Sequence, residues 1–114
     1  MIVSTKNVML ELFNHSKATL SDEKLNWIDG LSDVAESEAV NAAETLLYLG
    51  MIHGAAEPSD LPSTAQLSAI LLGLSNQAET ISALISISNE ATYLVGERKA
   101  KEAKKPEKTK ADQT

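Results

Sequence analysis

The chain has 114 residues, no cysteine and a formal net charge of −6. This length fits one domain with a single core, and the missing thiols exclude a disulfide framework or a thiolate metal site. The N-terminal apolar run is too short for a secretory signal, and no segment approaches the ~18 to 20 uninterrupted apolar residues of a membrane span. We therefore expect a soluble, cytoplasmic protein without a membrane partner.

The first helical pattern covers residues 5 to about 13. Ser4 precedes it as a candidate N-cap, and the apolar residues Val8, Leu12 and Phe13 recur at helical spacing. The pattern predicts a short N-terminal helix.

The second pattern runs from residue 22 to residue 53. Ser21 is a good N-cap, and Leu20 and Leu25 have the spacing of a hydrophobic staple. Its predicted inward face consists of apolar or small residues three and four apart. These are Leu25, Ile28, Leu31, Ala35, Ala39, Ala42, Leu46 and Leu49. The pattern favours one continuous helix; the alternative is a break at Gly30, with Ser32 capping a second helix.

The third pattern covers residues 64 to 100. Ser63 and Gln66 fit a capping box, so a helix should begin beside them. A predicted inward face with a period close to 3.5 residues follows. It consists of Leu67, Leu71, Leu74, Ala78, Ile81 and Ile85. Further on, the pattern widens onto a second face that includes Ile87 and Leu94.

The short breaker at residues 54 to 62 joins the two long patterns, and the sequence predicts an all-α fold built on an antiparallel helical hairpin. Small residues line its expected interior, so two helices alone would bury little apolar area. Pairing of two chains would cover the remaining faces. We therefore expect a homodimeric helical bundle.

Clusters that are apolar on every side flank the breaker, at residues 46 to 52 and 69 to 74. A helix of this kind is normally covered on all sides. Either the short N-terminal helix folds over the clusters, or a second chain covers them; the two arrangements are compatible. The candidate interaction residues come from these clusters, from the late face of the third pattern and from the single tryptophan. They are Leu46, Leu47, Met51, Ile52, Ile70, Leu72, Leu84, Ile87, Leu94 and Trp27.

Charge divides the chain into an acidic body and a basic tail. Residues 1 to 96 carry twelve acidic residues against three lysines, whereas residues 97 to 114 carry seven basic and four acidic residues. We expect a helical domain at residues 1 to 100 and a disordered Lys-rich tail at residues 101 to 114. The body should repel nucleic acid, while the tail could make nonspecific contact with it or act only as a solubilising segment.

No residue constellation indicates catalysis, a metal site or a cofactor site. The two histidines, His15 and His53, lack partners at ligand or triad spacing, and no Glu-x-x-His or phosphate-loop motif occurs. The sequence therefore predicts a non-enzymatic protein that binds a protein partner, by analogy a regulator or inhibitor of the phage or mobile-element type. The alternative is a self-associating structural component that tethers an acidic partner or nucleic acid through its tail.

Overall fold

The computed structural model describes residues 4 to 55 and 57 to 104, and they form an almost entirely helical chain. The described residues form helices and no strands, with a short N-terminal helix and a long C-terminal helix, which confirms the all-α part of the prediction. The elements in chain order are α1 (Thr5–Ser16), η1 (Lys17–Thr19), α2 (Asp22–Asp29), α3 (Leu31–Ala55), η2 (Pro58–Asp60) and α4 (Thr64–Lys104).

The predicted helix starts are confirmed by their caps. The Ser4 hydroxyl accepts from the Asn7 amide at the start of α1, and the Ser21 hydroxyl accepts from the Lys24 amide at the start of α2. At α4, Ser63 and Gln66 form a reciprocal capping box with distances of 2.8 and 3.1 Å. These bonds satisfy amides that have no partner within the helix.

The continuous helix favoured over residues 22 to 53 is wrong, because the chain turns at Gly30 between α2 and α3. The Asp29 carbonyl at this turn accepts the hydroxyl of Ser88 on α4 at 2.7 Å, and the Asp29 carboxylate accepts the hydroxyl of Thr92. Ser32 lies inside α3 and donates to the Asp29 carbonyl, so it does not act as the predicted cap. The turn is thus tied to α4 by tertiary hydrogen bonds.

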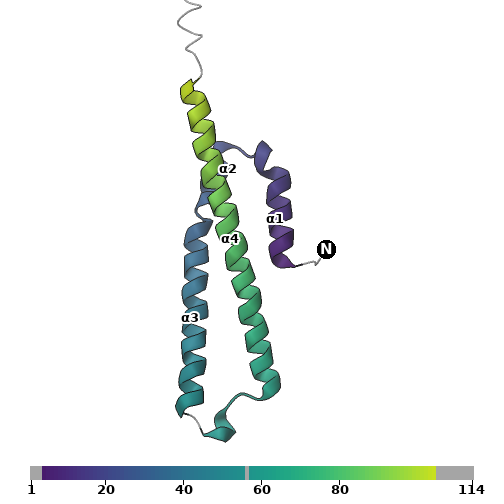
Figure 1. The fold of residues 1–114 in the computed structure, drawn as a ribbon, viewed down its shortest axis with the longest axis vertical. Coiled ribbons are helices and arrows are strands. Elements are labelled where there is room, and N and C mark those ends of the chain that lie inside the picture. Colours follow the sequence, from purple (N-terminus) through teal and green to yellow (C-terminus); the bar gives the residue numbers. More distant parts are fainter. Residues whose placement is uncertain (1–3, 56, 105–114) are drawn as a thin grey trace, which may run out of the picture.

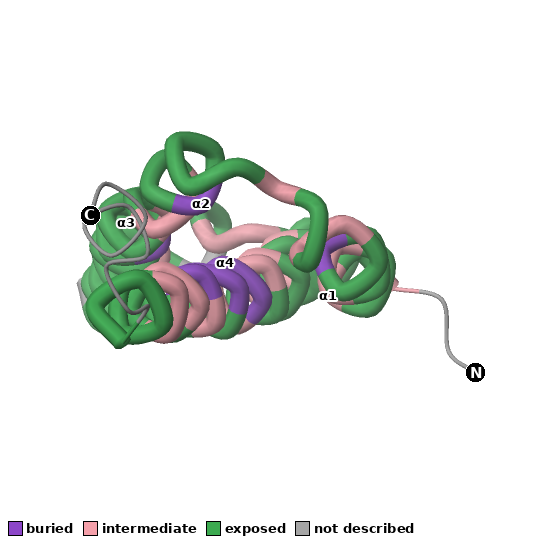
Figure 2. Tube along the Cα trace, turned by 90° about the horizontal axis from the view of Figure 1, so that it is seen from above, coloured by how far each residue is buried: buried purple, intermediate pink, exposed green. Residues whose placement is uncertain are grey.

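The helices form a flat, elongated arrangement around α4. In Figure 1, α4 runs the length of the molecule, α3 lies along one side of it, and α1 lies along the other; Figure 2 shows this arrangement end on. The two shorter principal extents of the Cα trace are 31 and 15 Å. Packed helix axes lie about 8–10 Å apart, so the molecule is no more than about two helices thick and every helix keeps one side in solvent.

The core lies where α1 and α2 meet the C-terminal half of α4. Phe13 of α1, Leu25 of α2 and Ile87 and Ala91 of α4 form one buried cluster. Leu25 and Ala91 are completely buried, with 0% of their surface exposed. The cluster joins α1 and α2 to α4, which lies much later in the chain, so it holds the tertiary structure together.

Helix α1 does not fold over the clusters beside the breaker, which was one of the two predicted arrangements. Its Lys6 donates to the Ser82 hydroxyl at 3.1 Å, and Lys17, just after it, pairs with Glu90 at 3.2 Å. Helix α1 therefore lies beside the middle and late part of α4, with Phe13 in the core cluster. This placement leaves both turn-end clusters uncovered by α1.

The face that α4 turns toward the core and α3 differs in part from the predicted one. Leu67, Leu74 and Ile81 are partly buried as expected, but Leu71 and Ile85 are 52% and 45% exposed. Three neighbouring positions are more buried than Leu71 and Ile85, namely Ile70, Gln77 and Leu84. A polar pair takes part in this contact: the Gln77 amide donates to the Glu38 carboxylate at 2.8 Å and to the Glu38 carbonyl at 3.2 Å. Of the predicted inward residues of α3, Ala39 and Leu46 are exposed.

Arg98, near the end of α4, binds the segment that joins α1 to α2. Its guanidinium donates to the Leu20 carbonyl at 2.7 Å, to the Asp22 carboxylate at 2.9 Å, and to the carbonyls of Lys17 and Ala18 at 3.5 Å. The sequence assigned this arginine to the basic segment from residue 97 onward. The helix continues through Lys104, while the rest of the predicted tail lies outside the described residues.

Replacing Arg98 with methionine should lower the free energy of unfolding by about 1–2 kcal/mol. The loss comes mainly from the carbonyls at residues 17 to 20, because hydrogen bonds to charged groups contribute about 1.5–3 kcal/mol and partly exposed ion pairs contribute less. Urea unfolding followed by circular dichroism measures the change, and amide hydrogen exchange should accelerate in α1. Lys101→Met is the matched control, since Lys101 is 74% exposed and pairs only with Glu97; equal effects of both substitutions would contradict the role of Arg98.

Candidate interaction surfaces

The side of α3 that faces away from α4 carries an apolar stripe. Val40, Leu47 and Met51 are 51%, 65% and 64% exposed. Their spacing of seven and four residues places them on one side of the helix, opposite the inward residues Ala35 and Leu49. We call these three residues the α3 stripe; it spans about 16 Å of helix axis at 1.5 Å per residue.

Carboxylates without a counterion border the α3 stripe. Asp33, Glu36 and Glu44 are exposed and form no ion pair among the residues the structure describes. The sequence explains this, because it has no lysine or arginine between Lys24 and Arg98. The surface of α3 therefore combines exposed apolar side chains with uncompensated negative charge.

A second exposed surface, on α4, is almost uncharged. Leu71, Ala78 and Ile85 repeat every seven residues and are all exposed. Between Thr64 and Asn89 the only charged residue is Glu79. We call Leu71, Ala78 and Ile85 the α4 outer seam; it is the part of the predicted inward face that the structure leaves in solvent.

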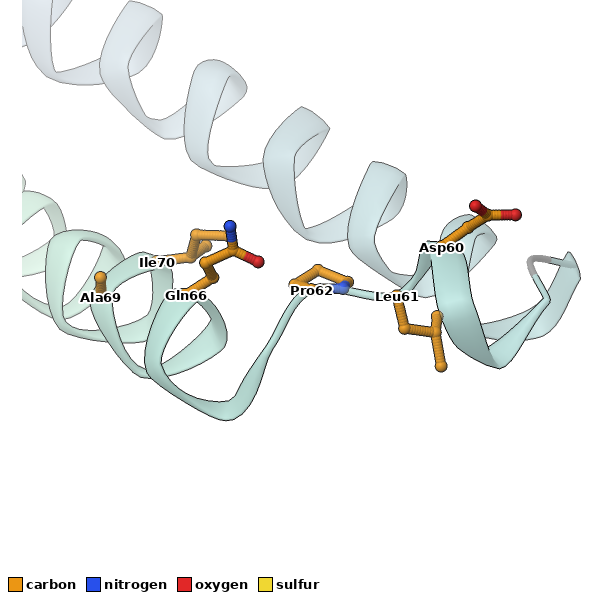
Figure 3. Close-up of a pocket in the computed structure, with 6 residues that line it drawn as sticks. All are labelled: Asp60, Leu61, Pro62, Gln66, Ala69 and Ile70. Carbon is orange, nitrogen blue, oxygen red and sulfur yellow. The ribbon is translucent and has the colours of Figure 1, made fainter.

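The turn between α3 and α4 is hollowed. An open groove of about 500 Å³ lies there, and six residues line it: Asp60, Leu61, Pro62, Gln66, Ala69 and Ile70. Figure 3 shows the side chains that line the groove. Ile70, one of the predicted interaction residues, is partly buried in it. Because few polar groups converge there and the groove opens to solvent, it offers little to enclose a small molecule.

The predicted interaction residues fall into three groups. The large exposed ones are Leu46, Leu47, Met51 and Leu72 near the turn, and Trp27 on α2, away from the turn. Ile52, Ile70 and Leu94 are partly buried, and Leu94 packs against the core cluster.

Leu84 and Ile87 form the third group and correct the prediction of a free late face on α4. They are only 7% and 5% exposed, and Ile87 belongs to the core cluster with Phe13 and Leu25. The pattern alone shows that this face is apolar, but α1 and α2, which come from earlier in the chain, cover the part around Ile87.

Two exposed aromatic residues were not singled out as site residues from the sequence. Tyr48 is 65% exposed beside the α3 stripe, and Tyr93 is 64% exposed on α4. Trp27 is 74% exposed, with the Lys24 ammonium 5.9 Å from its ring centroid. Of these, only Tyr48 lies within the apolar cluster at residues 46 to 52. That position could have indicated from the sequence that Tyr48 belongs to the candidate site.

Among residues 4 to 55 and 57 to 104, no group of three or more histidine, aspartate or glutamate side chains is placed to hold a metal ion. Helix α4 is long and apolar enough, by length and composition alone, to cross a membrane. Only 17% of its most apolar window is buried, and a single helix with these properties is weak evidence, so the finding does not assign the chain to a membrane.

Comparisons with protein-family models, with curated proteins and with solved structures find no match for this chain.

Proposed function

We propose that this chain is a non-enzymatic interaction protein that binds a protein partner through the α3 stripe and regulates or inhibits that partner by occupying its surface. The exposure of Leu47 and Met51, at 65% and 64%, is the observation that carries the proposal. Large apolar side chains clustered on a soluble surface mark interaction sites more often than scattered ones do. Val40, at 51% exposed, supports the same conclusion, because the described helices leave all three residues of the α3 stripe more than half exposed.

The proposal is tested by comparing what the immobilised full chain and two variants retain from a native lysate. Leu47→Ser with Met51→Ser should lose a protein that the unaltered chain retains, because the anchors of the interface are removed. Leu72→Ser with Tyr93→Ser is the matched control, since both residues are exposed on α4 at 65% and 64% and lie outside the α3 stripe and the α4 outer seam. Retention of the same proteins by all three chains would reject the α3 stripe as the binding surface.

The α4 outer seam favours a second candidate function, a self-associating structural component. Leu71, Ala78 and Ile85 have the seven-residue repeat of a coiled-coil contact, and the single charge nearby gives little repulsion between two copies. An α3-to-α3 contact would instead bring Asp33, Glu36 and Glu44 of two chains together. We therefore propose that the two chains of the homodimeric helical bundle pair through α4. Each chain would then bury its α4 outer seam.

Light scattering across a concentration series should show twice the mass of the 12.2 kDa chain. Leu71→Glu with Ile85→Glu should shift the protein to the monomer, because two charges would then be buried at the seam without partners. Val40→Glu on α3 is the control and should leave the mass unchanged. A monomer at every concentration would reject self-association.

The proposed tethering role of the tail is separated from partner binding by removing residues 105 to 114. This cut retains Arg98 and its bonds to residues 17 to 22, whereas a cut at residue 97 would weaken the fold itself. Partner binding through α3 should survive the cut. Tethering of nucleic acid or an acidic partner should be lost.

A further inference from the structure

We infer that the partner segment bound by the α3 stripe is a basic amphipathic helix. This inference rests on the proposed function and adds the chemistry of the partner. Two features of α3 must be matched by one ligand: an apolar line formed by Val40, Leu47 and Met51, and carboxylates on either side of it. A helix with apolar residues at helical spacing and lysine or arginine beside them has both.

The length of the stripe fits a helix as ligand. Val40 and Met51 are eleven residues apart, so about 16 Å of α3 is available at 1.5 Å per residue. An amphipathic helix presents anchors at positions i, i+4, i+7 and i+11 over the same length. Gly54 lies beside the stripe on α3, and apart from its chain neighbours and the nearby backbone of α3 no atom lies within 4 Å of where its Cβ would be, so a second helix can approach there closely.

Charge decides which helix binds. Asp33, Glu36 and Glu44 have no cationic partner among the described residues, and Arg98 is held at the far end of α4 by Leu20 and Asp22. Lysines or arginines of a ligand would supply counterions that none of the residues described by the structure supplies to these carboxylates. A second copy of this chain is disfavoured at the stripe, because its α3 would bring three more exposed carboxylates and no lysine or arginine.

The test uses the full chain and an 18-residue synthetic helix of leucine and lysine, with leucines at helical spacing and a fluorescent label. One control peptide has the same composition in an order that gives no apolar face, and a second replaces every lysine with glutamate. Fluorescence anisotropy measures the dissociation constants. We expect the ordered leucine and lysine peptide to bind, the shuffled peptide to bind at least ten-fold more weakly, and the glutamate peptide not to bind.

Variants of the chain locate the site. Leu47→Ser with Met51→Ser should weaken binding on the order of a hundred-fold through lost apolar burial. Glu36→Gln with Glu44→Gln should weaken it on the order of ten-fold, because each exposed ion pair contributes up to about five-fold. Glu79→Gln and Leu72→Ser are the matched controls on α4 and should leave the dissociation constant unchanged. Affinity should also fall as sodium chloride is raised, since screening weakens exposed charge pairs.

Three results would overturn the inference: equal binding of the ordered and shuffled peptides, binding that is insensitive to both sets of α3 variants, or no binding of the ordered peptide. Failure of the inference remains distinguishable from failure of the proposed function. If the peptide does not bind but Leu47→Ser with Met51→Ser still loses a protein retained from lysate, the α3 stripe binds a partner of different chemistry. If both experiments fail, the proposed function fails with the inference.

Discussion

Leu25→Ala is expected to lower the free energy of unfolding by about 2–5 kcal/mol, the range for removing a buried leucine side chain. Leu25 is 0% exposed and lies between Phe13 of α1 and Ile87 of α4. Small domains have a total stability of only about 5–15 kcal/mol, so this one change removes a large part of it. Urea unfolding followed by circular dichroism measures the loss, and α1 should lose its protection from hydrogen exchange.

Leu72→Ala provides the control for this prediction. Leu72 is 65% exposed on α4, so its truncation leaves no cavity and should change stability by no more than about 0.5 kcal/mol. Comparable losses for Leu25→Ala and Leu72→Ala would mean that the cluster of Phe13, Leu25, Ile87 and Ala91 is not the core of the protein in solution.

Ala91→Leu should destabilise the fold by about 1–3 kcal/mol through overpacking. Ala91 is 0% exposed in the core cluster, where α4 has no room for three further carbon atoms. Alanine and leucine have similar helix propensities, so the effect reports tertiary packing and not helix formation. The midpoint of urea unfolding should fall.

The matched substitution is Ala100→Leu, on an exposed position of the same helix. It should leave the midpoint within experimental scatter, since the added side chain lies in solvent. Unchanged stability of Ala91→Leu would show that α1 and α2 can move away from α4 at little cost, and that they are less firmly packed than the 0% exposure of Ala91 indicates.

The two exposed surfaces differ in the partner they suit because they differ in charge. The α3 stripe is bordered by carboxylates that form no ion pair within residues 4 to 55 and 57 to 104, which is why we propose a cationic ligand there. The α4 outer seam has one charge, at Glu79, between Thr64 and Asn89. On the proposed arrangement, a chain would pair with its own copy through α4 and still present α3. Testing mass and peptide binding on the same variants shows whether the two events are independent.

Local signals in the sequence determined the helices and most of their ends. Ser4, Ser21 and Ser63 cap the helices they were expected to cap, because a cap needs only a side chain and the next three residues. The apolar clusters beside the breaker, including Leu47 and Met51, were also visible in the sequence. Their exposure is what makes them a candidate site.

The tertiary structure alone decided which faces are covered. Leu67, Leu74 and Ile81 fit two alternative faces of α4, and the sequence favoured the one completed by Leu71, Ala78 and Ile85 because those residues continue a period close to 3.5 residues. In the structure the polar Gln77 takes part in the inward face, since its amide finds Glu38 as a partner.

The break at Gly30 and the position of α1 depend on α4 in the same way. Asp29 is held by Ser88 and Thr92, some 60 residues further along the chain, and α1 lies beside α4 through Lys6, Phe13 and Lys17. Periodicity and capping act over one or two turns of helix. Segments that are distant in sequence determine which of several apolar faces is covered. In this chain they cover Ile87, which belongs to the core, and leave Leu47 and Met51 exposed.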